Sequence, residues 1–148
     1  MMFLLDTNVV SELRKAPAGR ADAGVVAWAA SVPAADLYIS AITVLELELG
    51  ILQLLRRDAV QGAPLRRWMN EHVLPAFASR VLPVDVPVAL RAAQLHVPDR
   101  RAERDCLIAA TALVHGLTVV SRNGADFRAT GAALLDPWRA QPGKGRRA

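Results

Sequence analysis

The chain has 148 residues, enough for one domain with its own core, and its 53% hydrophobic and 22% charged residues are a globular rather than a disordered balance. Charged or polar residues interrupt every apolar run well before the roughly 20 residues that a membrane-spanning helix needs. The single cysteine, Cys106, excludes a disulfide framework within the chain. Together with an N-terminus that lacks the pattern of a secretory signal, it leads us to expect a cytoplasmic protein.

Short apolar runs alternate with helical patterns along the chain. In order, the pattern predicts a strand at residues 2–5, a helix at 25–31, a strand at 37–39, helices at 41–57 and 65–77, a strand at 81–84, helices at 88–96 and 102–115, and strands at 117–120 and 133–135. In the helix at 41–57, Leu45, Leu49 and Leu52 are spaced to share one face. The alternation implies a mostly parallel sheet covered on both faces. Ligands of such sheets bind at the carboxyl ends of the strands, near a topological switch point. We expect one domain at residues 1–140, followed by a basic tail at 141–148.

The charge distribution suits a polyanionic partner. The formal net charge is +4, and all basic residues except Lys15 and Lys144 are arginines. Arginine keeps its charge and binds phosphate in a bidentate way, as nucleic-acid binding requires. Aromatic residues make up only 5% of the chain, which argues against a surface that stacks on single strands without cutting them. We expect Trp28, Trp68 and Trp138 to anchor the core or an interface rather than to stack on RNA.

Three polar residues, Asp6, Thr7 and Asn8, follow the first strand directly. This position places Asp6 at the carboxyl edge of the sheet, where a ligand site is expected. The same residue types also cap helices, and a short helix over residues 9–14 would need such a cap. Spacing alone supports capping and chemistry equally, and the two roles are compatible.

Glu46 lies in the first turns of the helix at 41–57. Residues 43–46 fit a capping box, in which the glutamate reaches back to the start of its own helix. Ser40 is an alternative N-cap. Spacing alone therefore favours a structural role for this carboxylate.

Asp105 opens the helix predicted at 102–115. Helical spacing places it on one stripe with Ile108, Ala109 and Ala112, at the top of an apolar face that we expect to meet the core. A solvated charge is uncommon at such a position. An N-cap is again the alternative, but the pattern slightly favours a functional carboxylate.

More polar residues follow the fourth strand: Ser121, Arg122 and Asn123, with Asp126 just after them. Two strand ends and two helix starts thus offer polar groups to one edge of the sheet. Crowded carboxylates repel one another unless a cation neutralises them, and an all-oxygen set selects a hard ion such as Mg²⁺ or Mn²⁺. Such an ion can activate a water for attack on a phosphodiester. The candidate arginines that would hold the polyanion at the rim are Arg100, Arg101, Arg104 and Arg122.

Four segments stand in order along the chain: residues 4–12 (LLDTNVVSE), 40–47 (SAITVLEL) with Gly50, 105–112 (DCLIAATA), and 119–123 (VVSRN) with Asp126 and Phe127. They resemble the four motifs of PIN-domain ribonucleases. Residues 81–85 and 136–138 further resemble the VapC-type, FitB-like branch of that family. Each motif is weak alone, but the ordered set spans most of the chain and is specific.

The resemblance implies a three-layer α/β/α sandwich and an endoribonuclease that acts as the toxin of a type II toxin–antitoxin pair. It implies Mg²⁺ or Mn²⁺ held mainly by Asp6 and Asp105, with Glu46 completing the acidic set. It also implies cleavage of single-stranded RNA, a homodimer, and an antitoxin whose tail covers the site. The fourth group of the site stays open between Asn123 and Asp126. The candidates for contact with substrate are Thr7, Asn8, Ser121 and Arg122.

Two rival interpretations share parts of this pattern. A phosphatase of the haloacid dehalogenase type would use Asp6, but it needs a second Asp where Asn8 stands and a late Lys, and Lys144 lies in the predicted tail. A catalytically silent module that binds RNA or a partner protein would instead leave Asp6, Glu46 and Asp105 as helix caps.

Overall fold

The computed structural model describes residues 1–139, so the tail predicted at 141–148 and the end of the predicted domain lie outside the described residues. Within residues 1–139, five strands form one sheet, and all of their pairings are parallel. The strands are β1 (Phe3–Leu5), β2 (Leu37–Ser40), β3 (Val81–Leu82), β4 (Thr118–Val120) and β5 (Leu134–Leu135). Each overlaps a predicted strand.

The helices account for most of the remaining described chain. They are α1 (Thr7–Leu13), η1 (Ala16–Ala18), α2 (Ala23–Ala30), η2 (Ala34–Asp36), α3 (Ala41–Arg57), α4 (Ala59–Trp68), the π-helical η3 (Met69–Val73), α5 (Leu74–Ala76), α6 (Val86–Leu95), α7 (Glu103–His115) and α8 (Gly124–Arg128). Among the helices of residues 1–139, none has the length and apolar character that crossing a bilayer demands.

Helices α1, α2 and α6 each begin two residues earlier than predicted, and the helix predicted at 65–77 begins six residues earlier. The segment expected to be helical at 65–77 starts at Ala59, where the side chain of Asp58 caps α4 by accepting two backbone N–H groups at 3.1 Å. The sequence does not predict a helix start at Ala59, because Gly62 and Pro64 follow it and both residue types are poor helix formers.

The order of strands in the sheet is β3-β2-β1-β4-β5. The chain first builds outward from β1 through β2 to β3, and then returns to the other side of β1 to add β4 and β5. The topological switch point therefore lies between β1 and β4. Leu5 pairs with Val120 across this boundary, so the residues that follow β1 and β4 emerge side by side.

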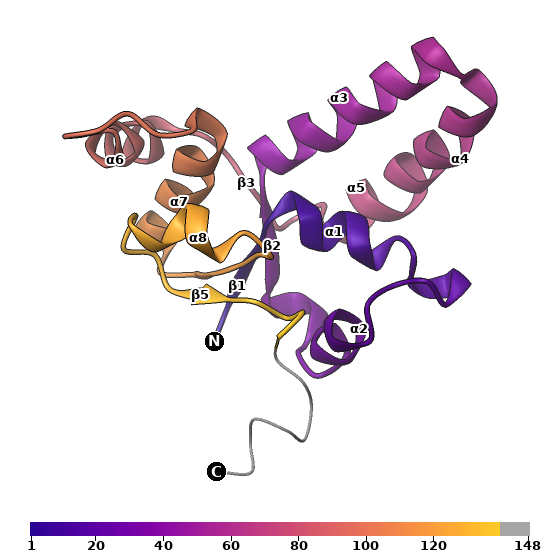
Figure 1. Cartoon of the computed structure of the whole chain (residues 1–148), viewed down its shortest axis with the longest axis horizontal. Coiled ribbons are helices and arrows are strands. Elements are labelled where there is room, and N and C mark those ends of the chain that lie inside the picture. Colours follow the sequence, from indigo (N-terminus) through magenta and orange to yellow (C-terminus); the bar gives the residue numbers. More distant parts are fainter. Residues whose placement is uncertain (140–148) are drawn as a thin grey trace.

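The sheet separates two layers of helices (Figure 1). Phe3 and Leu5 of β1 pack against the layer that contains α1, α2, α3 and η3, whereas Leu4 packs against the layer of α6, α7 and α8. This alternation follows from the two-residue period of a strand. The architecture is the α/β/α sandwich that the sequence predicts.

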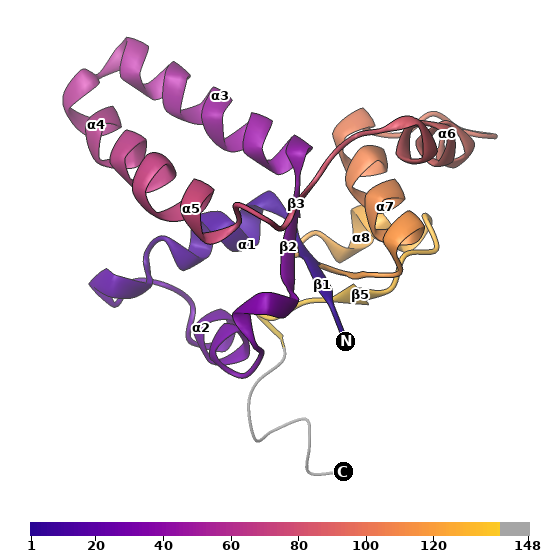
Figure 2. The same ribbon diagram turned by 180° about the vertical axis from the view of Figure 1, so that it is seen from behind.

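Helices α3 and α4 form a hairpin that projects from the sheet (Figures 1 and 2). Leu47 and Ile51 are the buried apolar side chains of α3. Leu45, Leu49 and Leu52 do share a face, but that face is exposed, with 46%, 37% and 51% of each residue's surface accessible. The hairpin thus carries a second, uncovered leucine stripe.

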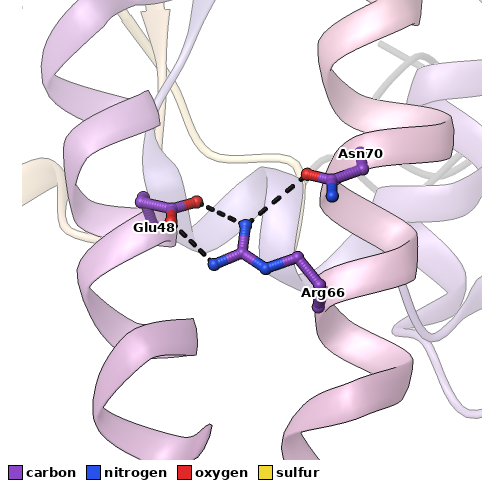
Figure 3. Close-up of polar contacts among 3 residues, drawn as sticks. All are labelled: Glu48, Arg66 and Asn70. Atoms are coloured by element: carbon purple, nitrogen blue, oxygen red, sulfur yellow. Dashed lines mark hydrogen bonds and ion pairs between the residues drawn. The ribbon is translucent and has the colours of Figure 1, made fainter.

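Two contacts set the spacing of this hairpin. The guanidinium of Arg66 donates to both oxygens of Glu48 at 2.8 and 2.7 Å, and also to Asn70 Oδ1 at 3.5 Å (Figure 3). Nearer the turn, Gly62 packs so closely on Leu55 that a Cβ at Gly62 would lie 2.6 Å from Leu55 Cδ2. An ion pair and a close backbone approach therefore join α3 to α4.

Candidate active site

Asp6 stands at the carboxyl end of the central strand. Its backbone N–H donates to Val120 O at 2.9 Å, and its Oδ1 accepts the Thr7 N–H at 2.8 Å as the N-cap of α1. Its Oδ2 accepts from the Ser121 hydroxyl at 2.7 Å and from Asn8 Nδ2 at 3.3 Å. The residue is only 5% exposed. The cap is therefore real, and it leaves a buried carboxylate held in one orientation.

The loop after β4 is tied to the loop after β1. The Ser121 oxygen accepts the Asn123 N–H at 2.9 Å, and Asn8 Oδ1 accepts the Arg122 N–H at 3.3 Å. Ser121 is buried, and its hydroxyl donates to Asp6. The side chains of the other three residues line the open space above.

Glu46 does not cap its own helix. The N-cap of α3 is Ser40, whose hydroxyl oxygen accepts a backbone N–H of the first turn at 2.9 Å, so the capping box predicted at residues 43–46 is wrong. Glu46 Oε1 instead accepts from the Thr7 hydroxyl at 2.6 Å, and Oε2 lies 3.6 Å from Arg104 Nη1. This carboxylate therefore links α3 to α1 and α7.

Asp105 lies in the first turn of α7, three residues after Ala102, which occupies the N-cap position. The predicted stripe below it is correct, because Ile108, Ala109 and Ala112 are buried. The N-cap alternative is wrong, and the carboxyl group faces the same space as Asp6 and Glu46.

Burial and repulsion between charges disfavour ionisation of Asp6 and Asp105. Burial raises the pKa of Asp6 above its usual range, despite the hydrogen bonds that the carboxylate accepts. Burial also raises the pKa of Asp105 to about 6, and the charges of Asp6, Asp126 and Glu46 add to the effect. The site therefore carries negative charge that a cation would relieve.

The three carboxylates open into one cavity of about 500 Å³ at the carboxyl edge of the sheet. The lining residues are Asp6, Thr7, Asn8, Ser11, Glu12, Arg14, Lys15, Glu46, Asp105, Arg122, Asn123 and Trp138. The fold thus gathers Asp6 from the end of β1, Glu46 from α3 and Asp105 from α7, which are far apart in the chain.

A second cavity, of about 320 Å³, adjoins the first at Asp105. Asp126 of α8 lines it together with Arg100 and Arg101. Asn123, by contrast, lines the first cavity. Asn123 and Asp126 also both line a third cavity, of about 690 Å³. Of the two candidates for the fourth polar group, Asp126 is the one whose charge raises the pKa of Asp6 and of Asp105.

The donor set suits a hard cation that needs few protein ligands. It consists of carboxylate oxygens, and the raised pKa values mark charge that the protein itself leaves uncompensated. Over residues 1–139, no three His, Cys, Asp or Glu side chains gather closely enough to enclose a metal ion among them. Mg²⁺ typically keeps several waters and takes one or two protein carboxylates. Asp6 and Asp105, the two carboxyl groups whose pKa is raised, both line this cavity.

The sequence reasoning missed several lining residues. Three of these are Ser11, Glu12 and Lys15, which share helical spacing with the predicted candidate Asn8, and that spacing indicates one shared face. Trp138 carried no such signal, because only the path of β5 brings residues after the sheet back to the cavity. Trp28, as predicted, is a core residue.

Comparisons with known proteins agree with this arrangement. The profile of the PIN domain matches residues 3–133. The protein named Toxin FitB from Neisseria gonorrhoeae is 43% identical over 143 residues, which cover 93% of this chain and 99% of that protein. VapC ribonuclease Y4jK from Sinorhizobium fredii is 39% identical over 145 residues, which cover 93% of this chain and 98% of that protein.

Solved structures give the same result. The crystal structure of FitAcB from Neisseria gonorrhoeae aligns with a TM-score of 0.83 and 40% identity, covering 93% of this chain and 99% of that chain. DNA-bound VapBC from Salmonella typhimurium aligns with a TM-score of 0.68 and 23% identity, covering 93% of this chain and 98% of that chain, and supports the fold alone. A profile match over most of the chain, and relatives aligned over nearly their full length, show that this chain belongs to the PIN domain family.

Proposed function

We propose that the protein is a metal-dependent endoribonuclease that acts as the toxin of a toxin–antitoxin pair. The observation that carries the proposal is the convergence of Asp6, Glu46 and Asp105 on one cavity at the switch point of the sheet. The relatives named as a toxin and as a ribonuclease support this class of activity. The phosphatase alternative loses its basis, because the chain is a member of a different family.

Asp6 and Asp105 would hold the cation, Mg²⁺ or Mn²⁺. When bound, such an ion stabilises charge on a phosphodiester oxygen and lowers the pKa of a water. Ser121 and Asn8 fix the Asp6 carboxylate in place through their hydrogen bonds. Glu46, held by a hydrogen bond from α1, would complete the acidic set and orient a water.

Basic residues around the carboxylates would hold the RNA. Arg122 lines the first cavity, Arg100 and Arg101 line the second, and Arg104 contacts Glu46. Arginine binds phosphate oxygens in a bidentate way, so this arrangement suits a strand that passes over the acidic centre. We infer single-stranded RNA as substrate, in a cytoplasmic setting.

Two protein partners belong to the proposal. Solved relatives include a structure titled as a toxin–antitoxin complex from Klebsiella pneumoniae, and we infer a cognate antitoxin that covers the site here. We also infer a homodimer, because the exposed leucines of α3 form an apolar stripe that a second copy would cover. The stripe consists of Leu45, Leu49 and Leu52.

The decisive test is cleavage of a labelled, mixed RNA pool by the purified protein. We expect cleavage with Mg²⁺, none with EDTA, and none with Asp6→Asn, because that variant removes a charge from the metal pair. Asp99→Asn, a change at an exposed acid outside both cavities, is the matched control and should cleave normally.

Thermal unfolding separates the proposal from the silent alternative. A ligand that binds only the folded state raises the melting temperature, so Mg²⁺ should stabilise the wild-type protein and stabilise Asp6→Asn less. Cleavage that survives EDTA or Asp6→Asn would contradict the proposed site. Absence of both cleavage and a Mg²⁺ effect on melting would favour a silent binding module.

A further inference from the structure

Basic and aromatic residues line the first cavity together with its carboxylates. They are Arg14, Lys15, Arg122 and Trp138. Lys15 already pairs with a glutamate of α1 at 2.8 Å, and the Arg14 guanidinium carbon lies 6.0 Å from the ring centroid of another tryptophan outside the cavity. The pair of Arg122 and Trp138 is therefore the feature among these residues that calls for a separate explanation.

The guanidinium of Arg122 lies near enough to the indole of Trp138 to interact with it. The guanidinium carbon is 5.2 Å from the centroid of the indole, within the range of a cation–π contact. Trp138 is anchored from below, since it packs against the core and its backbone N–H donates to Asp136 Oδ1 at 2.9 Å. Arg122 is exposed, and Asn8 holds its backbone N–H. An anchored indole thus holds a cationic side chain beside it at the cavity wall.

The chemistry of this pair differs from that of a simple phosphate contact. Nucleobases of single-stranded RNA stack on aromatic rings and on guanidinium planes. A guanidinium that already rests on an indole has less conformational freedom to lose when a base stacks on it. A lysine at the same place would attract phosphate but would present no plane.

We propose that Arg122, supported by Trp138, is a stacking platform for one nucleobase of single-stranded RNA beside the scissile phosphodiester. The platform shares its cavity with Asp6 and Asp105, so the stacked base belongs to a nucleotide next to the bond that is cut. The contact selects the nucleotide at that position. This inference rests on the proposed ribonuclease function and adds a determinant of its specificity.

The experiment measures binding of fluorescent, mixed-sequence oligoribonucleotides to the Asp6→Asn protein in EDTA. An abasic nucleotide is moved through every position of the oligonucleotide in turn. Loss of a stacked base typically weakens binding about tenfold, and we expect this loss at one position. In protein that also carries Arg122→Lys, the intact oligonucleotide should bind about as weakly as the abasic one, and the abasic effect should vanish.

The salt dependence separates stacking from charge. Arg122→Lys keeps the charge, so the slope of log affinity against log salt should not change, whereas Arg122→Gln should reduce it. Arg20→Lys, at an exposed arginine outside the cavities, should change neither slope nor affinity. Trp138→Leu should reproduce the loss of the abasic effect, with its melting temperature measured alongside because this residue packs on the core.

The proposed platform is wrong if the ratio of the affinities for intact and abasic oligonucleotides is the same in Arg122→Lys as in the parent protein. Cleavage of the same oligonucleotides by protein with Asp6 intact tests the ribonuclease separately. Cleavage whose nucleotide preference survives Arg122→Lys would overturn the platform and keep the ribonuclease. Platform-dependent binding without any cleavage would overturn the ribonuclease and keep the platform.

Discussion

At the scale of single residues, the site depends on a contact between the residue that follows β1 and the residue that follows β4. Asp6 and Ser121 are 115 positions apart in the chain, yet both are buried and are joined by a hydrogen bond of 2.7 Å. The position of each after an apolar strand could be deduced from the sequence. Their contact could not, because it depends on β1 and β4 being neighbours in the sheet.

Removal of the Ser121 hydroxyl should disturb the metal pair. In Ser121→Ala, Asp6 Oδ2 keeps only the longer bond from Asn8, at 3.3 Å. Loss of a partner that orients a metal ligand typically costs roughly 10- to 100-fold in metal affinity or activity, and we expect a decrease of that size in cleavage rate across a Mg²⁺ titration. Ser121→Thr keeps the donor and should retain most of the activity. Equal losses in the two variants would contradict the assigned role.

Asp105 should make the metal-free protein more stable in mild acid. Its pKa in the folded protein is about 6, above the ordinary value of 3.8, so its contribution to stability is complete below that ordinary value and is lost as the pH rises through about 6. In EDTA, Asp105→Asn should therefore be more stable than wild type near neutral pH, by about 1 kcal/mol after allowance for solvent screening of a half-buried group.

Urea unfolding in EDTA at several pH values between mild acid and neutrality checks this prediction. The advantage of Asp105→Asn should shrink as the pH falls below about 6. Asp99→Asn, at an exposed acid, provides the comparison. A stability difference that does not change with pH would show that repulsion at Asp105 is not its cause.

At the scale of elements, periodicity predicts the existence of helices better than their buried faces. The bounds of α3 match the prediction, but α3 has two apolar stripes. Leu47 and Ile51 lie on the buried one, and Leu45, Leu49 and Leu52 lie on the exposed one. Spacing alone cannot rank two stripes of similar hydrophobicity, because the choice depends on where the neighbouring helices pack.

The same limit explains the misassigned role of Glu46. A capping box is a local pattern, and residues 43–46 satisfy it in the sequence. In the structure Ser40 caps the helix, and the Glu46 carboxylate accepts a hydrogen bond from a hydroxyl of α1. That partner is 39 positions away, so no local rule could identify it. The functional interpretation of this residue came from the family resemblance instead.

The α3–α4 hairpin offers a matched pair of glycines. At Gly62 an added Cβ would lie 2.6, 2.8 and 3.0 Å from three atoms of Leu55, including its Cα, so the helices must separate. We expect Gly62→Ala to lower the free energy of unfolding by about 1–3 kcal/mol. At Gly50 the same methyl meets open space, and Gly50→Ala should stabilise the protein by about 0.5–1 kcal/mol through helix propensity.

Urea unfolding of the two alanine variants checks this prediction, with hydrogen exchange of α4 as a local readout. Gly62→Ala should speed exchange in α4 more than in the sheet. If both substitutions changed stability in the same direction, the close approach at Leu55 would not be what sets the spacing of the hairpin.

At the scale of the whole molecule, alternating strands and helices were sufficient to predict a covered parallel sheet, with the site at the carboxyl ends of its strands. The order of the strands was not predicted, although it is what places Asp6 beside the loop after β4. The place of Trp138 in the cavity was not predicted either, because it follows from the path of the chain beyond β5. Sequence patterns report local periodicity, and neighbourhood in space is a property of the complete fold.

The inferred homodimer leads to a prediction at this scale. Leu49→Glu places a charge in the exposed stripe of α3, where a second copy would have to bury it. We expect sedimentation to show that the variant is monomeric. Its circular dichroism spectrum should be nearly unchanged, because the stripe is exposed and the fold does not depend on it. Leu90→Glu, at an exposed leucine of α6, should remain dimeric. A wild-type protein that is monomeric at every concentration would contradict the dimer.

The position of β4 also bears on how the protein is made. Until β4 is synthesised, β1 has a strand on one side only, and Asp6 lacks the hydroxyl and the loop that complete its surroundings. Asp105 is already present on the growing chain, but the cavity wall formed by Arg122, Asn123 and Trp138 is not. A nascent chain that has not yet reached Ser121 therefore carries an incomplete active site. Chains released early by stalling or truncation should be harmless to the RNA around them.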